Sequence, residues 1–149
     1  MSFTGYRIFN VLYFGEVREP ILASLNQRPH YYKFFGPVCT GADPFRVHHG
    51  GFYAFKNALT LHSAFDISMG RSFRVFGHTW AEVEMYGNVV EHTDGYRSQK
   101  LRFSRIFIPR HTYEPHQIEM LGNRYQCDVG YTDDHPLYTF DVPPFIACY

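Results

Sequence analysis

The chain has 149 residues and a formal net charge of zero, with 14 basic and 14 acidic side chains. This balance argues against nucleic-acid binding, because neutralising phosphates requires a clustered excess of positive charge. The length fits a single domain, and an aromatic content of 19% indicates a β-rich core, since Tyr and Phe favour strands.

The spacing of the cysteines and the hydropathy of the sequence indicate in which cellular compartment the protein is expected. The three cysteines form no C-x-x-C pair, which argues against a disulfide framework and a zinc site and favours a reduced, cytoplasmic protein. The sequence has no run of 18 apolar residues, and its first residues lack the pattern of a secretory signal. We therefore expect a soluble protein with no membrane contact.

The first half of the chain contains three strand-like segments and one helix-like segment. Tyr6–Phe14 is rich in aromatic and β-branched residues, as strands are. Tyr31–Phe35 is a shorter aromatic run that ends at a Gly-Pro breaker. Phe52–Phe55 has the composition of a short buried strand. The residues that follow, Asn57–Met69, have apolar side chains at helical offsets and predict the main helix.

The second half predicts further strands and a short helix. Arg71–Phe76 and Thr79–Tyr86 are expected to be two strands or one bent strand, and Leu101–Ile108 alternates as another strand. Pro115 suits the first turn of a short helix over Pro115–Leu121. Beyond Gly130 the chain becomes rich in proline and aromatic residues.

These elements predict one α+β domain over residues 1–130. We expect a twisted, mostly antiparallel sheet of about five or six strands, one main helix and one short helix. Residues 131–149 are expected to form a tail that packs on the domain or serves as a binding arm.

A polar cluster follows the alternating strand that begins at Trp80. It contains Glu91, His92, Asp94, Tyr96 and Arg97 within seven residues. One interpretation is a structural turn in which Glu91 and Arg97 form an ion pair. In that turn His92 and Asp94 satisfy backbone groups, and Gly95 takes a positive φ. The other is the floor of a pocket, in which Arg97 binds an anionic group, Tyr96 stacks on the ligand, and His92 acts as a donor or a base.

Other catalytic or metal-binding patterns are not found in the sequence. The nine histidines show no H-E-x-x-H or H-x-H spacing, so no metal site is predicted. The chain also lacks a G-x-S-x-G nucleophile turn and a glycine-rich phosphate loop.

Two segments carry a resemblance to a family. The segment Tyr86–Ser98, YGNVVEHTDGYRS, follows the pattern WGxVxEHxxGYRA, and Gly51–Ala54 follows the pattern CGxYA without its cysteine. Through these segments the stretch from Gly5 to Ile108 resembles small bacterial and phage domains of unknown function. His49 and Gly50 stand near the position of the missing cysteine.

We expect a small binding protein that acts on a host protein or a small anionic ligand, without a cofactor. Its expected ligand-binding residues are Arg7, Tyr53, His92, Tyr96 and Arg97. The resemblance implies a phage-encoded protein in the host cytoplasm, with inhibition of a host defence system as one such role. The sequence leaves homo-oligomerisation open.

The layout of the chain is also similar to that of ADP-ribosyltransferase-like folds, which would make the protein an enzyme that uses NAD. The similarity consists of an opening Tyr-Arg strand and a Gly-x-Tyr-Ala-Phe strand that continues into a helix. In those folds an aromatic residue stacks on nicotinamide and a later glutamate acts on the ribose. The resemblance implies Tyr53 and Glu91 as catalytic candidates. Further candidates are Tyr6, Arg7, Glu82 and Glu84.

Overall fold

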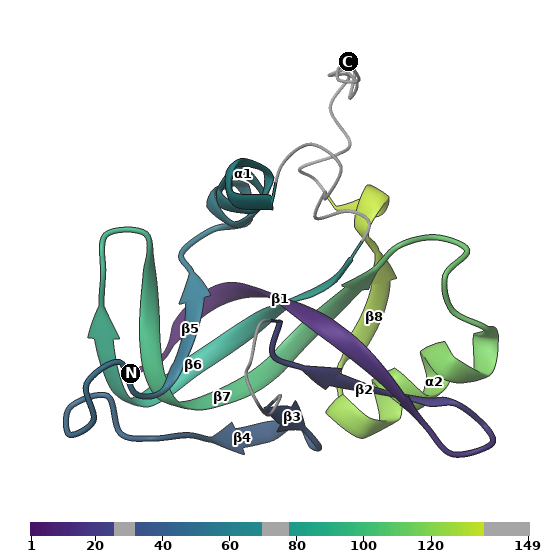
Figure 1. Ribbon diagram of the computed structural model, residues 1–149, viewed down its shortest axis with the longest axis horizontal. Coiled ribbons are helices and arrows are strands. Elements are labelled where there is room, and N and C mark those ends of the chain that lie inside the picture. The colour runs from purple at the N-terminus through teal and green to yellow at the C-terminus, as the bar shows by residue number, and fades with distance from the viewer. Residues whose placement is uncertain (26–31, 70–77, 136–149) are drawn as a thin grey trace.

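The computed structural model describes residues 1–25, 32–69 and 78–135, which form a single α+β domain (Figure 1). The strands are β1 (Phe3–Phe14), β2 (Glu19–Ala23), β3 (Lys33–Phe34), β4 (Val38–Thr40), β5 (Phe52–Phe55), β6 (Thr79–Glu91), β7 (Gly95–Ile108) and β8 (Asp128–Tyr131). The helices are α1 (Ala58–Met69), α2 (Pro115–Tyr125) and the 3-10 helix η2 (Thr132–Asp134). No helix in the described ranges is long and apolar enough to cross a membrane.

The sheet closes on itself through four of its strands. β1 pairs with β6, β6 forms a long hairpin with β7, β7 pairs with β5, and β5 returns to β1 through the Tyr6–Phe55 pair. This circuit gives the strongly curved sheet seen in Figure 1. β4 and β8 pair with the edge of β7 that also pairs with β5. β8 runs parallel to β7. The other described pairings are antiparallel, as predicted.

Strand alternation sorts the side chains onto two faces of the sheet. We call one the core face, because it carries the main hydrophobic core, which α2 closes with Leu121 and Tyr125. We call the other the α1 face, because Leu61 of α1 packs there with Trp80 of β6 and Phe107 of β7. In β6 the buried core-face residues are Ala81, Val83 and Met85.

Most predicted elements are confirmed, with longer strands around the polar cluster. β6 continues to Glu91 and β7 starts at Gly95, so the cluster forms the tip of a hairpin. Gly87 has a φ of 78° at a shift in register between Tyr86 and Val89, where β6 contains one more residue than the facing part of β7. The predicted strand Arg71–Phe76 lies outside the described residues.

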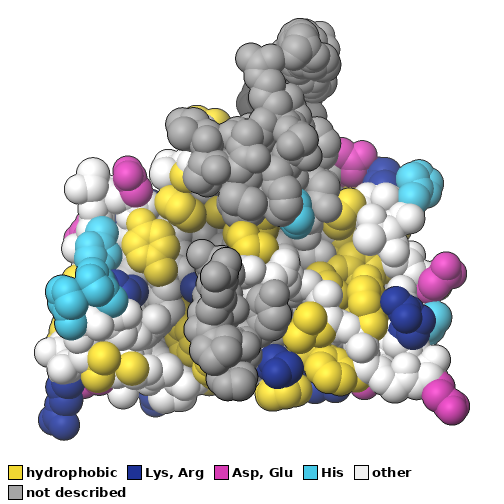
Figure 2. Space-filling view, viewed as in Figure 1, with side chains coloured by type: hydrophobic (Ala, Val, Ile, Leu, Met, Phe, Trp, Pro, Cys, Tyr) yellow, Lys and Arg dark blue, Asp and Glu magenta, His cyan; other side chains and the backbone are white. Residues whose placement is uncertain are grey.

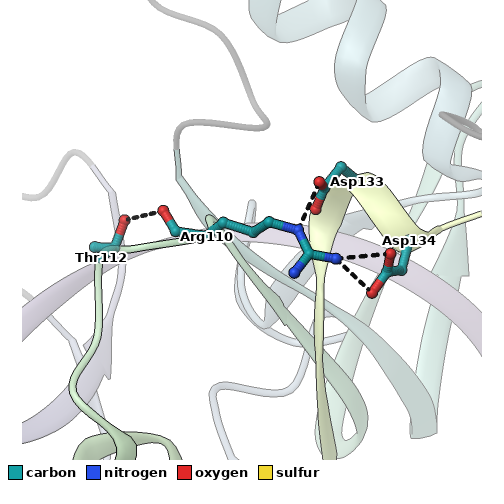
Figure 3. Close-up of polar contacts among 4 residues, drawn as sticks. All are labelled: Arg110, Thr112, Asp133 and Asp134. Atoms are coloured by element: carbon teal, nitrogen blue, oxygen red, sulfur yellow. Dashed lines mark hydrogen bonds and ion pairs between the residues drawn. The ribbon is translucent and has the colours of Figure 1, made fainter.

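The first residues of the predicted tail pack against the domain. Arg110 contacts Asp133 through Nε at 2.7 Å and Asp134 through one terminal nitrogen at 2.9 and 3.0 Å, while Thr112 donates a hydrogen bond to the Arg110 carbonyl (Figure 3). The buried Trp80 indole donates to Thr132 Oγ1 at 3.0 Å. Residues 131–135 are thus part of the folded domain, and residues 136–149 lie outside the described part.

Candidate functional site

Three predicted site residues come together on the α1 face. Tyr53 of β5 lies directly opposite Arg97 of β7, and His92 follows the end of β6. One terminal nitrogen of Arg97 lies 2.8 Å from His92 Nε2, and the Tyr53 and His92 ring centroids are 6.0 Å apart. All three side chains are half-buried. We refer to them as the Tyr53–His92–Arg97 cluster.

Gly95 allows this arrangement, because a side chain there would collide with its neighbours. A Cβ atom on Gly95 would lie 2.3 Å from the Ala54 carbonyl oxygen and 2.6 Å from the Tyr53 hydroxyl. The His92 amide also donates to the Gly95 carbonyl at 2.8 Å and closes the hairpin tip. The Tyr53 ring can therefore lie across the start of β7 only because that residue is a glycine.

The Arg97 guanidinium makes no ion pair within the part of the chain that the structure describes. Arg102, which is on the same strand, does form an ion pair, since its guanidinium lies 3.3 Å from Glu84 Oε1. The predicted Glu91–Arg97 ion pair is wrong, since Glu91 contacts Lys56 Nζ at 2.6 Å. Arg97 contacts the His92 imidazole through one terminal nitrogen and has further N–H groups for another acceptor.

Tyr96 lies on the core face, away from Arg97. It is opposite Ala54, which belongs to the core, and its ring centroid is 4.7 Å from that of Phe3. Lys56 Nζ lies 5.4 Å from the centroid of the same ring. In the strand register Tyr96 is paired with Glu91 of β6. The predicted stacking of Tyr96 on a ligand stays a prediction, and Tyr53 is the aromatic residue beside the Arg97 guanidinium.

Arg7 also points to the core face. It donates to the Tyr53 carbonyl at 2.7 Å and to Ser24 Oγ at 3.0 Å, and its guanidinium carbon lies 5.7 and 5.5 Å from the Phe9 and Phe34 ring centroids. Its Nε is shut off from solvent without a partner among the described residues, and burial lowers the pKa of Arg7 to about 10. Arg7 thus joins the end of β2 to the backbone of Tyr53, behind the cluster.

The residues implied by the transferase resemblance divide between the two faces. Tyr6 donates a hydrogen bond to Glu82 at 3.0 Å on the α1 face, the face of Tyr53. Burial, followed by this contact with Glu82, raises the pKa of Tyr6 to about 12. Glu84 is two positions further along β6 on the same face, whereas Glu91 is on the core face. Burial, and next the charge of Asp94, raises the pKa of Tyr53.

Charge on the visible surface is local rather than gathered into a patch. On the face shown in Figure 2, the described Lys and Arg side chains are scattered among apolar and uncharged ones. Among the described residues, no group of three or more His, Cys, Asp or Glu is placed to hold a metal ion.

A groove elsewhere on the molecule offers less for an anion. It has a volume of about 590 Å³ and lies between the β1–β2 turn and the start of α2. His116 contacts the Val17 carbonyl at 3.3 Å, and the Gln117 amide donates to the Arg18 carbonyl at 3.0 Å. These contacts hold the turn to the helix. Arg18 also lines the groove, with its guanidinium carbon 4.8 Å from the Tyr13 ring centroid, but the acidic residues Glu16 and Glu114 line it as well and would repel an anion.

Sequence reasoning assigned Gly95 only to a turn position with positive φ, which is wrong because Gly95 does not take that conformation, and it missed Lys56. Gly95 had a detectable signal, because a glycine at the beginning of a strand marks a close approach of another group. Lys56 had no detectable signal in the sequence, because its ion-pair partner Glu91 is 35 positions away. The fold and the cluster define a small α+β domain with a half-buried cationic group beside an aromatic ring.

Comparisons of the chain with protein-family models, with curated proteins and with solved structures return no match.

Proposed function

We propose that this protein binds a small anionic ligand at the Tyr53–His92–Arg97 cluster. The observation that carries the proposal is the half-buried Arg97 side chain, whose guanidinium contacts the His92 imidazole and no carboxylate of the described residues. Arginine binds carboxylates and phosphates through two parallel N–H donors, and partial burial strengthens such bonds. The Tyr53 phenol, whose ordinary pKa of 10.0 is raised further by burial, is protonated near pH 7 and stands beside this guanidinium as a further donor.

An acidic or phosphorylated group of a protein partner would present the same chemistry as a free anion. A phage-encoded protein that acts on a host protein could use the cluster in that way. Small probes separate the two cases, because a free ligand binds without any partner surface.

The proposal is tested by titrating the protein with sulfate and with NAD⁺ while recording amide NMR shifts. We expect saturable shifts at Tyr53, His92 and Arg97, and a loss of affinity of about tenfold or more in Arg97→Gln, because a charge-assisted hydrogen bond contributes about 1.5–3 kcal/mol. The matched control is Arg102→Gln, which removes an exposed arginine of the same strand that is already paired with Glu84. Its affinity should equal that of the wild type.

Two outcomes would overturn the proposal. One is the absence of saturable shifts with both probes. The other is an equal loss of affinity in Arg97→Gln and Arg102→Gln, which would indicate a general charge effect rather than a site.

Cleavage of NAD is the second candidate function, and it is favoured by the shared face of Tyr53, Tyr6 and Glu82. A carboxylate that acts on ribose beside Tyr53 would then be Glu82 rather than Glu91, which is paired with Lys56 on the core face. We expect nicotinamide release to be lost in Glu82→Gln and retained in Glu91→Gln, as measured by chromatography. Retention in Glu82→Gln would remove Glu82 from this role, and no release from the wild type would exclude the activity.

A further inference from the structure

The contact between Arg97 and His92 fixes the protonation state of the imidazole. A guanidinium can only donate hydrogen bonds, so His92 Nε2, at 2.8 Å, must accept one. The imidazole is therefore neutral in this arrangement, with its proton on Nδ1. A protonated His92 would place an N–H group and a second positive charge directly against the guanidinium.

We propose that His92 takes up one proton when an anion binds at the cluster, so that the anion binds more tightly at acidic pH; this inference rests on the proposed function. In the ligand-free site, protonation of His92 breaks the contact with Arg97 and sets two cations side by side. An anion between the imidazolium and the guanidinium removes that penalty, since it accepts hydrogen bonds from both. The proton comes from solvent and forms the Nε2–H bond that His92 then donates to the anion.

The other charged groups around His92 do not account for such a pH dependence. Tyr53 faces it from β5, and its pKa, raised from an ordinary value of 10.0, lies far above this range. Asp94 at the hairpin tip and Lys56 after β5 act on the same phenol, and Lys56 is paired with Glu91. Side-chain carboxylates and lysine amines as classes titrate outside the range from about pH 5.5 to about pH 8, whereas imidazoles titrate within it.

Linkage gives the size of the expected effect. If binding requires the protonated imidazole, affinity falls by up to about tenfold per pH unit once the free site is neutral. Between about pH 5.5 and about pH 8 we therefore expect the wild type to lose affinity by at least about tenfold. Sulfate and NAD⁺ are suitable probes, because neither their sulfate nor their diphosphate groups titrate in this range.

The experiment is calorimetric titration with NAD⁺ and with sulfate at both pH values, in two buffers of different ionisation enthalpy. The wild type should take up close to one proton per bound anion near neutral pH. His92→Gln should bind at about pH 8 with an affinity within about threefold of the wild type and show no pH dependence. The matched control, His116→Gln, alters a histidine that contacts the Val17 carbonyl and should keep the wild-type profile.

The outcomes separate this inference from the proposed function. Anion binding by the wild type that depends on Arg97 but is independent of pH, with no proton uptake, would overturn the inference and leave anion binding standing. A pH dependence that persists in His92→Gln would overturn it as well. Absence of binding at both pH values would overturn both, and proton uptake by the wild type tests the inference even if His92→Gln does not fold.

Discussion

Gly95→Ala is expected to destabilise the domain by about 3 kcal/mol and to weaken anion binding at the cluster. The new methyl group would lie 2.3 Å from the Ala54 carbonyl oxygen and 2.6 Å from the Tyr53 hydroxyl. The first of these atoms belongs to the backbone of β5, so relief requires β5 and β7 to separate. Such a separation also moves Tyr53 away from Arg97, its partner in the strand register.

Urea unfolding followed by circular dichroism measures the stability, and NAD⁺ titration measures the binding. Gly130→Ala is the matched control, since it also lies in a strand but a Cβ atom there meets nothing within 4 Å. We expect its free energy of unfolding to stay within about 0.5 kcal/mol of that of the wild type. Equal stability of the two variants would show that the space above Gly95 is open, contrary to the structure.

Tyr125→Phe is expected to cost about 2–4 kcal/mol, although it removes a single oxygen atom. The Tyr125 hydroxyl donates to the Phe34 carbonyl at 2.5 Å and accepts from the Leu22 amide at 2.8 Å, in a fully buried position. It thereby joins the end of α2 to two neighbouring strands. Its removal leaves a buried N–H and a buried C=O without this partner.

Tyr86→Phe is the matched control for this substitution. Tyr86 is half-buried, and its ring lies beneath the cationic groups of Lys100 and Arg102, so it keeps these contacts as a phenylalanine. We expect it to change the free energy of unfolding by less than about 0.5 kcal/mol. If Tyr125→Phe changed the free energy of unfolding equally little, water or a backbone shift would have to provide hydrogen bonds for the Leu22 N–H and the Phe34 C=O.

The fold was predictable where a segment was strongly periodic. The alternation over Thr79–Tyr86 and Leu101–Ile108 and the helical offsets after Phe55 each predicted the element that is present. β8 was missed because it is a parallel strand of four residues, and its pairing with β7 depends on α2 as a crossover. Such a strand carries no local signal that separates it from a loop.

The position of the candidate site along the chain was predictable from the sequence. Which face of the sheet carries each of its side chains was not. Both the hairpin tip and Tyr53 were expected at the site, and His92 and Arg97 do meet Tyr53 there. Simple alternation does not reveal which of Tyr96 and Arg97 faces outward, because the register shift after Tyr86 resets the pattern. The partner of Glu91 was equally hidden, since Lys56 arrives from another strand.

The closure of the sheet has a consequence for how the chain is made. Tyr6 and Glu82 pair across the sheet although 76 positions separate them. During synthesis from the N-terminus, β1 is followed by two of its partners, β2 and the short β5, but more than half of the chain is made before β6 is complete. Contacts between such distant residues form slowly, so the nascent chain carries an aromatic strand without its longest pairing until β6 has been made.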